Sequence, residues 1–153
     1  MKVVIVGGVA GGASAAARIR RLDEQAQIVI FERSGFVSYA NCGLPYYIGG
    51  TIKDKRALTL QTPQSFFSRF AIDVKVRHEV MEINREKKTV TVKNLETGGT
   101  FEESYDKLIL SPGARAIYPN LPNIDSKHIF TLRTVEDTFR ISDAVNNQKP
   151  RSA

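Results

Sequence analysis

A single cysteine, Cys42, is the residue of this chain best suited to covalent chemistry. It lies within Ser-Tyr-Ala-Asn-Cys-Gly-Leu-Pro-Tyr-Tyr, residues 38–47. A thiolate is a nucleophile and a redox group, but free cysteine is also among the residue types most often buried as inert core. The thiol alone therefore leaves two interpretations open, a redox centre and a small core residue.

The neighbours of Cys42 favour a reactive thiol. Pro45 is typical of the first turn of a helix, so we expect a helix to begin just after Cys42, where free main-chain N–H groups stabilise a thiolate. Ser38 and Asn41 add short polar side chains that can hydrogen-bond a ligand. Tyr47 stands where a C-x-x-x-x-C reductase would have its second cysteine. A disulfide or sulfenate formed by Cys42 must therefore involve a group outside this chain.

A glycine-rich loop at residues 7–12 gives a second chemical signal. Such a loop lets main chain approach a pyrophosphate at a helix N-terminus. Val9 occupies the middle position of G-x-G-x-x-G, which weakens the motif, although Gly8 and Gly11 flank it. Glu32, 20 residues after Gly12, is spaced to accept hydrogen bonds from ribose hydroxyls and to disfavour a 2′-phosphate. Together these residues predict an adenine dinucleotide, without separating FAD from NAD.

The elements that position these motifs read as a βαβ unit. Lys2 to Val6 is an apolar run typical of a buried parallel strand, Ala13 to Leu22 is rich in helix formers, and Ile28 to Glu32 predicts the second strand. A right-handed crossover places the second strand beside the first. A short helix follows from Pro63, with Thr62 as its N-cap, and Ile72 to Val76 predicts a third strand.

The later part of the chain changes pattern twice. Alternating segments between about residues 79 and 104, separated by charged or glycine turns, predict an antiparallel β-meander. Tyr105 to Leu110 predicts a further parallel-type strand, and the stretch from Ile117 to Asp125 is expected to be irregular because it contains two prolines. Thr134 to Val145 predicts a helix with an approximate capping box, and residues 148–153 resemble the lead-in to another strand.

Composition and charge exclude several classes of protein. With 153 residues, 42% of them hydrophobic, one globular domain is the default. No apolar run approaches the roughly 20 residues of a membrane span, and a single cysteine favours a cytoplasmic home over export. The net charge of +6 admits an anionic ligand, but its clusters lack the basic stripe with aromatics of a nucleic-acid binder. We expect no membrane partner, no nucleic acid and no metal site.

Several segments resemble a known family. Val6 to Leu22, Phe31 to Arg33 and Ser38 to Gly50 are similar to the N-terminal part of coenzyme A disulfide reductases, single-cysteine members of the FAD-dependent pyridine nucleotide-disulfide oxidoreductase family. The resemblance extends through Tyr105 to Ala114 and Phe130 to Asp137. It implies that Cys42 is the redox-active catalytic residue.

The resemblance also implies a fold and a cofactor. The expected fold class is α/β, a Rossmann-like parallel sheet with an inserted antiparallel β-meander, forming an incomplete FAD-binding domain. Residues 1–115 would be the first segment of that domain, and residues 116–153 a connector toward an absent NAD(P)H-binding domain. The turn after residue 110 reads Ser-Pro-Gly where the family usually has Ala-Thr-Gly, so a threonine hydroxyl is missing. The residues expected to bind FAD are Gly7, Val9, Ala10, Gly11, Gly12, Glu32, Arg33, Val80, Ser111, Pro112, Gly113 and Arg133.

The implied reaction is reduction of coenzyme A disulfide, or of a related persulfide or polysulfide, by NADH or NADPH. Ser38 and Asn41 match residues around the reactive sulfur. Ser14, Arg18 and Arg21 match positions that face the nucleotide end of coenzyme A, and their i, i+4, i+7 spacing puts them on one helical face. The full-length parent is expected to be a homodimer.

Two alternatives remain open. The first is an NADH oxidase or peroxidase that cycles Cys42 through a sulfenate, although peroxidase-type relatives carry a histidine where this chain has Ala10. The second is a flavin-binding fragment without catalysis of its own. For the reductase and for both alternatives, we expect this chain to be inactive alone, to bind FAD with impaired affinity, and to self-associate through the exposed edge of the strand from Tyr105 to Leu110.

Overall fold

The structure, a computed structural model, describes residues 1–150 and forms two compact units. The first unit contains Met1–Tyr39 and Thr59–Gly113, and the second contains Ala40–Leu58 and Ala114–Ala153. The segment 148–153, interpreted as the lead-in to another strand, is only partly described, because residues 151–153 lie outside the described residues; Gln148 ends the last helix.

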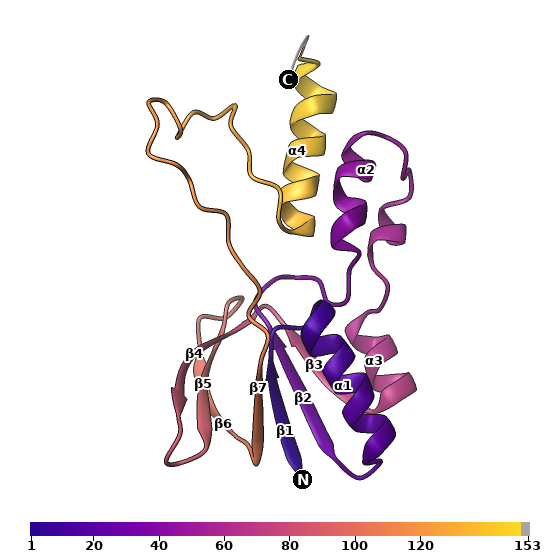
Figure 1. The fold of residues 1–153 in the computed structure, drawn as a ribbon, viewed down its shortest axis with the longest axis vertical. Coiled ribbons are helices and arrows are strands. Elements are labelled where there is room, and N and C mark those ends of the chain that lie inside the picture. The colour runs from indigo at the N-terminus through magenta and orange to yellow at the C-terminus, as the bar shows by residue number, and fades with distance from the viewer. Residues whose placement is uncertain (151–153) are drawn as a thin grey trace. The chain divides into compact units, whose positions relative to one another are not determined.

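The first unit is built on a four-stranded parallel sheet with the strand order β3-β2-β1-β7 (Figure 1). The predicted pairing of the first two strands is confirmed. The last strand begins later than predicted, because the N–H groups of Tyr105 and Asp106 donate to the carbonyls of Lys88 and Lys2. The elements of this layer are β1 (Lys2–Val6), α1 (Ala10–Leu22), β2 (Gln27–Glu32), α3 (Pro63–Phe70), β3 (Ile72–Val76) and β7 (Lys107–Leu110).

Alternation along the strands divides the core between two faces of this sheet. Val3 and Ile5 of β1 point to one face, where they pack with Ala16 of α1 and Phe66 of α3. Both helices cover this face in Figure 1. The spacing of two residues between inward side chains is what a pleated strand requires, and the apolar run in β1 fills both faces.

The opposite face is covered by the predicted meander, which is confirmed as a three-stranded antiparallel sheet (Figure 1). Val90 and Val92 pack against Val4, Val29 and Phe31 of the parallel sheet. A register shift between Val80 and Glu82 interrupts the pairing near the start of the meander. Its strands are β4 (His78–Asn84), β5 (Thr89–Asn94) and β6 (Thr100–Ser104).

The regular secondary structure described in the second unit is helical. It contains the 3-10 turns η1 (Asn41–Gly43) and η2 (Lys55–Leu58) and the helices α2 (Leu44–Ile48) and α4 (Val135–Gln148). Tyr47 of α2 meets Phe139 of α4 edge-on, with ring centroids 5.9 Å apart, and Lys55 Nζ lies 3.8 Å from the centroid of the Phe139 ring. The predicted irregular stretch is confirmed, since residues 111–133 form neither helix nor strand.

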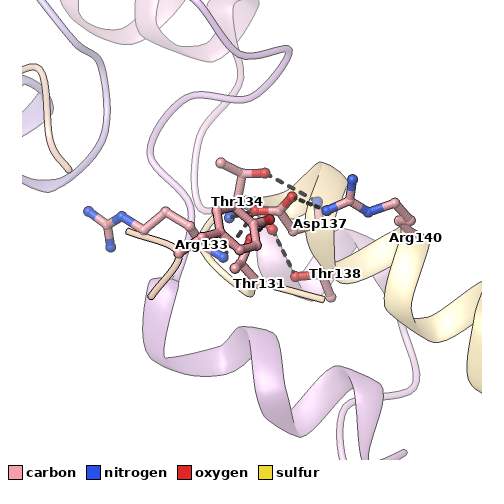
Figure 2. A network of polar contacts seen from close by, with 7 residues as sticks. Thr131, Arg133, Thr134, Asp137, Thr138 and Arg140 are labelled. Carbon is pink, nitrogen blue, oxygen red and sulfur yellow. Dashed lines mark hydrogen bonds and ion pairs between the residues drawn. The ribbon is translucent and has the colours of Figure 1, made fainter. Parts of the chain in front are cut away.

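The N-terminus of α4 is capped by side chains of its own first turn (Figure 2). Thr134 Oγ1 accepts from the Asp137 N–H at 3.2 Å, and Asp137 Oδ2 accepts from the Thr134 N–H at 3.0 Å, which confirms the predicted capping box. Arg140 donates to Asp137 Oδ1 at 3.0 Å, and the hydroxyl of Thr138 donates to the Thr134 carbonyl. The helix runs past the predicted end at Val145 to Gln148.

Candidate functional site

The glycine loop lies at the carboxyl end of β1 and is shaped by two close approaches. Gly7 has a φ of +92°, and a Cβ there would lie 2.1 Å from the Ser111 carbonyl oxygen. A Cβ on Gly12 would lie 1.8 Å from the Gly7 carbonyl oxygen. Both distances are far below contact, so glycine is required at these two positions for the loop to turn tightly into α1.

The N-terminus of α1 is open. Val9 is its N-cap residue, no side chain caps it, and its first turn contains no acidic residue. The partial positive charge of these N–H groups makes such a terminus an anion-binding position. Val9, the departure from the glycine motif, precedes the helix, and Ala10 and Gly11 are exposed at its first positions.

Glu32 ends β2 beside this loop and is only 7% exposed. Its Oε2 accepts from the Gly8 N–H and its Oε1 accepts from the Ser34 N–H, both at 2.8 Å. The carboxylate is therefore fixed in place and itself holds the glycine loop. Each carboxylate oxygen has two lone pairs, so acceptor capacity remains for ribose hydroxyls.

A cavity of about 120 Å³ opens where β1, β2 and β4 meet in the first unit. Five of the predicted cofactor residues line it, and the structure adds four that the sequence reasoning missed. Two of the four, His78 and Glu79, directly precede the predicted Val80 in the chain, so that prediction could have pointed to them. The predicted lining residues are Gly7, Glu32, Arg33, Val80 and Pro112, and the additional ones are Val6, Phe31, His78 and Glu79.

The turn after β7 lies against the glycine loop. The Ser111 N–H donates to the Val6 carbonyl at 2.8 Å, and Gly113 has a φ of +72°. A Cβ on Gly11 would lie 3.1 Å from Ser111 Oγ. The Ser-Pro-Gly turn thus packs beside the loop even though it lacks the threonine hydroxyl of the usual family turn.

Three predicted ligand residues share an exposed face of α1. Ser14, Arg18 and Arg21 are all exposed, and their side chains form no hydrogen bond or ion pair within residues 1–150. Arg20 differs, because its guanidinium donates to several carbonyl oxygens, including those of Phe70 and Ala26 at 2.7 Å each. The exposed arginines are available to an anionic ligand, whereas Arg20 ties α1 to its neighbours.

Cys42 is exposed and lies in η1, directly before Gly43, which is the N-cap of α2. The helix predicted after the cysteine is present, and it is five residues long. Asn41 Oδ1 is buried without a hydrogen-bond partner in the described part of the chain. Ser38 belongs to the first unit, where its N–H donates to the Gly8 carbonyl at 2.9 Å and its φ is +48°.

Arg133 belongs to the second unit, and its contacts are made there (Figure 2). Its N–H donates to Asp137 Oδ2 at 3.1 Å, and its Nε donates to the Ala114 carbonyl at 3.4 Å. Across residues 1–150 no cluster of three or more His, Cys, Asp or Glu side chains is arranged to hold a metal ion. None of the helices in that range is long and apolar enough to cross a membrane.

Comparison with known proteins gives consistent matches along the chain. Residues 1–150 match the family described as pyridine nucleotide-disulphide oxidoreductase. The chain is 51% identical over 152 residues to the coenzyme A disulfide reductase of Staphylococcus epidermidis, covering 99% of this chain and 34% of that protein. The Staphylococcus aureus enzyme of the same name is 51% identical over 144 residues, covering 94% of this chain and 32% of the enzyme. The chain thus spans about a third of the length of these relatives.

Solved structures match the same region. Reduced CoADR-RHD from Bacillus anthracis is 53% identical with a TM-score of 0.96, over 98% of this chain and 27% of that one. An NAD-dependent persulfide reductase from A. fulgidus is 34% identical with a TM-score of 0.90, over 96% of this chain and 28% of that one. A water-forming NADH oxidase from Lactobacillus brevis is 30% identical with a TM-score of 0.83, over 97% and 32%.

Proposed function

The chain belongs to the pyridine nucleotide-disulphide oxidoreductase family, and we propose that it is the N-terminal, FAD-binding part of a reductase that acts on coenzyme A disulfide or a related persulfide or polysulfide. The observation that carries the proposal is the exposed Cys42, the one cysteine of the chain, in a sequence half identical to coenzyme A disulfide reductases. We propose residues 1–115 as the first segment of the FAD-binding domain and residues 116–153 as a connector toward an NAD(P)H-binding domain.

The first unit supplies the cofactor site. The open N-terminus of α1 and the glycine loop would hold the pyrophosphate of FAD, since both offer main-chain N–H groups without a competing side chain. Glu32 would hold the ribose, with Arg33 and the main chain of Val80 beside the adenosine. Ser111, Pro112 and Gly113 would close the site from the turn after β7.

The second unit supplies the thiol chemistry. The Cys42 thiolate attacks one sulfur of the disulfide, forming a mixed disulfide with one coenzyme A and releasing the other as its thiolate. The chemistry that FAD supplies when bound is transfer of an electron pair from NADH or NADPH to that mixed disulfide. Ser38 and Asn41 are proposed to position the reacting sulfurs, and Arg133 is proposed as a further cofactor contact.

The face of α1 formed by Ser14, Arg18 and Arg21 is proposed to bind the phosphates of coenzyme A. Two unpaired guanidinium groups suit a multiply phosphorylated thiol. The homodimer of the parent and self-association of this chain through β7, an edge strand of the described sheet, also stay predictions.

The test is the reaction of the chain with coenzyme A disulfide, followed by intact mass. We expect one coenzyme A adduct per chain, released by a reducing agent, and none in Cys42→Ser. The double variant Arg18→Gln/Arg21→Gln should slow this reaction about tenfold or more while leaving the reaction with glutathione disulfide unchanged, because two charge-assisted contacts are lost.

The matched control is Arg85→Gln/Lys87→Gln, which removes the same charge from the exposed turn between β4 and β5. It should not alter either rate. A Cys42 that forms a sulfenate with peroxide but no coenzyme A adduct would replace the disulfide proposal with the oxidase alternative, for which the Lactobacillus brevis neighbour is the structural precedent.

A further inference from the structure

His78, the first residue of β4, lines the cavity of the first unit and has no role in the function proposed above. It is one of only two histidines in the chain. The same cavity is lined by Glu32 and Arg33 at the end of β2 and by Val80, two positions after His78 in β4. Because His78 lies next to the predicted adenosine site, the hydrogen bonds of its ring decide what it could offer to a bound base.

The His78 ring is held by one hydrogen bond and two aromatic contacts. Its Nδ1 lies 2.7 Å from the carbonyl oxygen of Val76. A carbonyl can only accept, so Nδ1 carries the hydrogen, and in the neutral ring Nε2 is left as an acceptor. The rings of Phe31 and Phe101 flank the imidazole, with centroid distances of 6.3 and 6.0 Å. The orientation of the ring is therefore fixed before any ligand arrives.

The charged side chains around the cavity each already have a contact within the protein. Both oxygens of Glu32 accept main-chain hydrogen bonds, and Arg33 forms an exposed ion pair with Glu79 at 3.9 Å. No described residue forms a hydrogen bond with Nε2 of His78. His78 thus lines the cavity with its Nε2 not engaged by any described residue.

We propose that His78 is an adenine-recognition residue, whose Nε2 accepts a hydrogen bond from the exocyclic amino group of the bound cofactor. This inference rests on the proposed FAD site. A hypoxanthine or guanine base presents a carbonyl oxygen at the same ring position, so two acceptors would face each other and the pairing would be lost. His78 would then select an adenine dinucleotide by the base, independently of the ribose contact at Glu32.

The test compares ADP with IDP, which differ at this position of the base, by titration calorimetry on the complete chain. We expect ADP to bind about tenfold more tightly than IDP, as one hydrogen bond gained and one repulsion avoided would give. His78→Asn retains a side-chain donor for the Val76 carbonyl but lacks Nε2. It should bring the two affinities within about twofold of each other, through weaker binding of ADP.

The matched control is His128→Asn at the other histidine, which is exposed in the second unit. It should leave the preference for ADP intact. Thermal unfolding of His78→Asn checks that the fold is retained, and His78→Phe, which keeps the aromatic contacts, serves as the second variant. A wild-type chain that binds ADP and IDP equally, or a preference that survives in both His78 variants, overturns the inference alone. Failure of the wild-type chain to bind either nucleotide or FAD overturns the cofactor proposal as well.

Discussion

The helices of this protein begin in two different ways. At α3 and α4 a threonine N-cap and a polar residue three positions later satisfy each other's main-chain N–H groups. At α1 the N-cap is Val9, and no side chain performs that task. The capping boxes of α3 and α4 supply acceptors for main-chain N–H groups at their own N-termini. In contrast, α1 begins at the glycine loop with N–H groups available to a ligand.

The electrostatic contrast follows the same division. The first turn of α4 contains Glu136 and Asp137, which complement the positive end of the helix. The first turn of α1 contains alanine and glycine only. An acidic residue there would stabilise the helix but repel a pyrophosphate. The difference teaches that a missing cap, in a helix that follows a tight glycine turn, indicates a binding function.

The largest expected effect is on stability and comes from adding a Cβ at Gly12, where the start of α1 lies against the main chain that follows β1. Helix propensity alone favours alanine over glycine by about 1 kcal/mol, yet a Cβ in Gly12→Ala would meet the Gly7 carbonyl oxygen at 1.8 Å. We expect the free energy of unfolding to fall by about 2 kcal/mol or more, measured by urea denaturation. Gly49→Ala, whose new Cβ would find its nearest neighbour at 3.5 Å, should change it little.

An intermediate effect is expected from supplying α1 with the charge it lacks. Ala10→Asp should stabilise the helix by about 0.5 kcal/mol and weaken FAD binding at least about tenfold, because the new carboxylate competes for the same N–H groups. Flavin fluorescence quenching measures the affinity. Gln64→Glu adds the same charge to the first turn of α3, where we propose no ligand, and equal loss of FAD affinity in both variants would remove the distinction between the two kinds of helix.

The smallest expected effect is on stability, from removing the side-chain cap of a helix that has one. Thr134→Ala should cost about 1 kcal/mol of stability, since the N–H of Asp137 loses its acceptor (Figure 2). Thr62→Ala should cost a similar amount at α3. Thermal unfolding measures both, and Thr134→Ser, which keeps the hydroxyl, should restore most of the loss. A large loss of FAD affinity in Thr62→Ala would mean that self-capped helices also serve the cofactor.

Local sequence signals were sufficient for most of the fold. Apolar runs predicted β1 and β2, alternation predicted the meander, and Thr62 and Thr134 predicted the two capped helices. Each of these signals depends on neighbours within a few positions of the chain. The strand β7 was predicted too long because main-chain bonds to distant Lys88 and Lys2 take over at its start.

Short motifs predicted part of the candidate site, and the family resemblance predicted Arg33, Val80 and Pro112 of the cavity lining. The glycine loop and Glu32 follow from spacing, but the second task of Glu32, holding the Gly8 N–H, needs the tertiary contact to be known. His78 and Glu79 join the cavity because the meander packs on the parallel sheet; no local pattern specifies that packing, and only their position beside the predicted Val80 pointed to them. Gly43 rather than Cys42 caps α2, which the position of Pro45 could not resolve.

The carbonyl contacts of Arg20 bear on how freely α1 can vary. Lysine would preserve the charge at Arg18 and Arg21, where the guanidinium groups are exposed and unpaired. At Arg20 a single ammonium could not reproduce a planar fork that reaches carbonyls on α3 and before β2 at once. Arg18, Arg20 and Arg21 look interchangeable in the sequence, but they should tolerate substitution differently. Because Arg20 ties α1 to neighbouring main chain, its substitution would alter the orientation of α1 and with it the direction of the exposed Arg18 and Arg21 side chains.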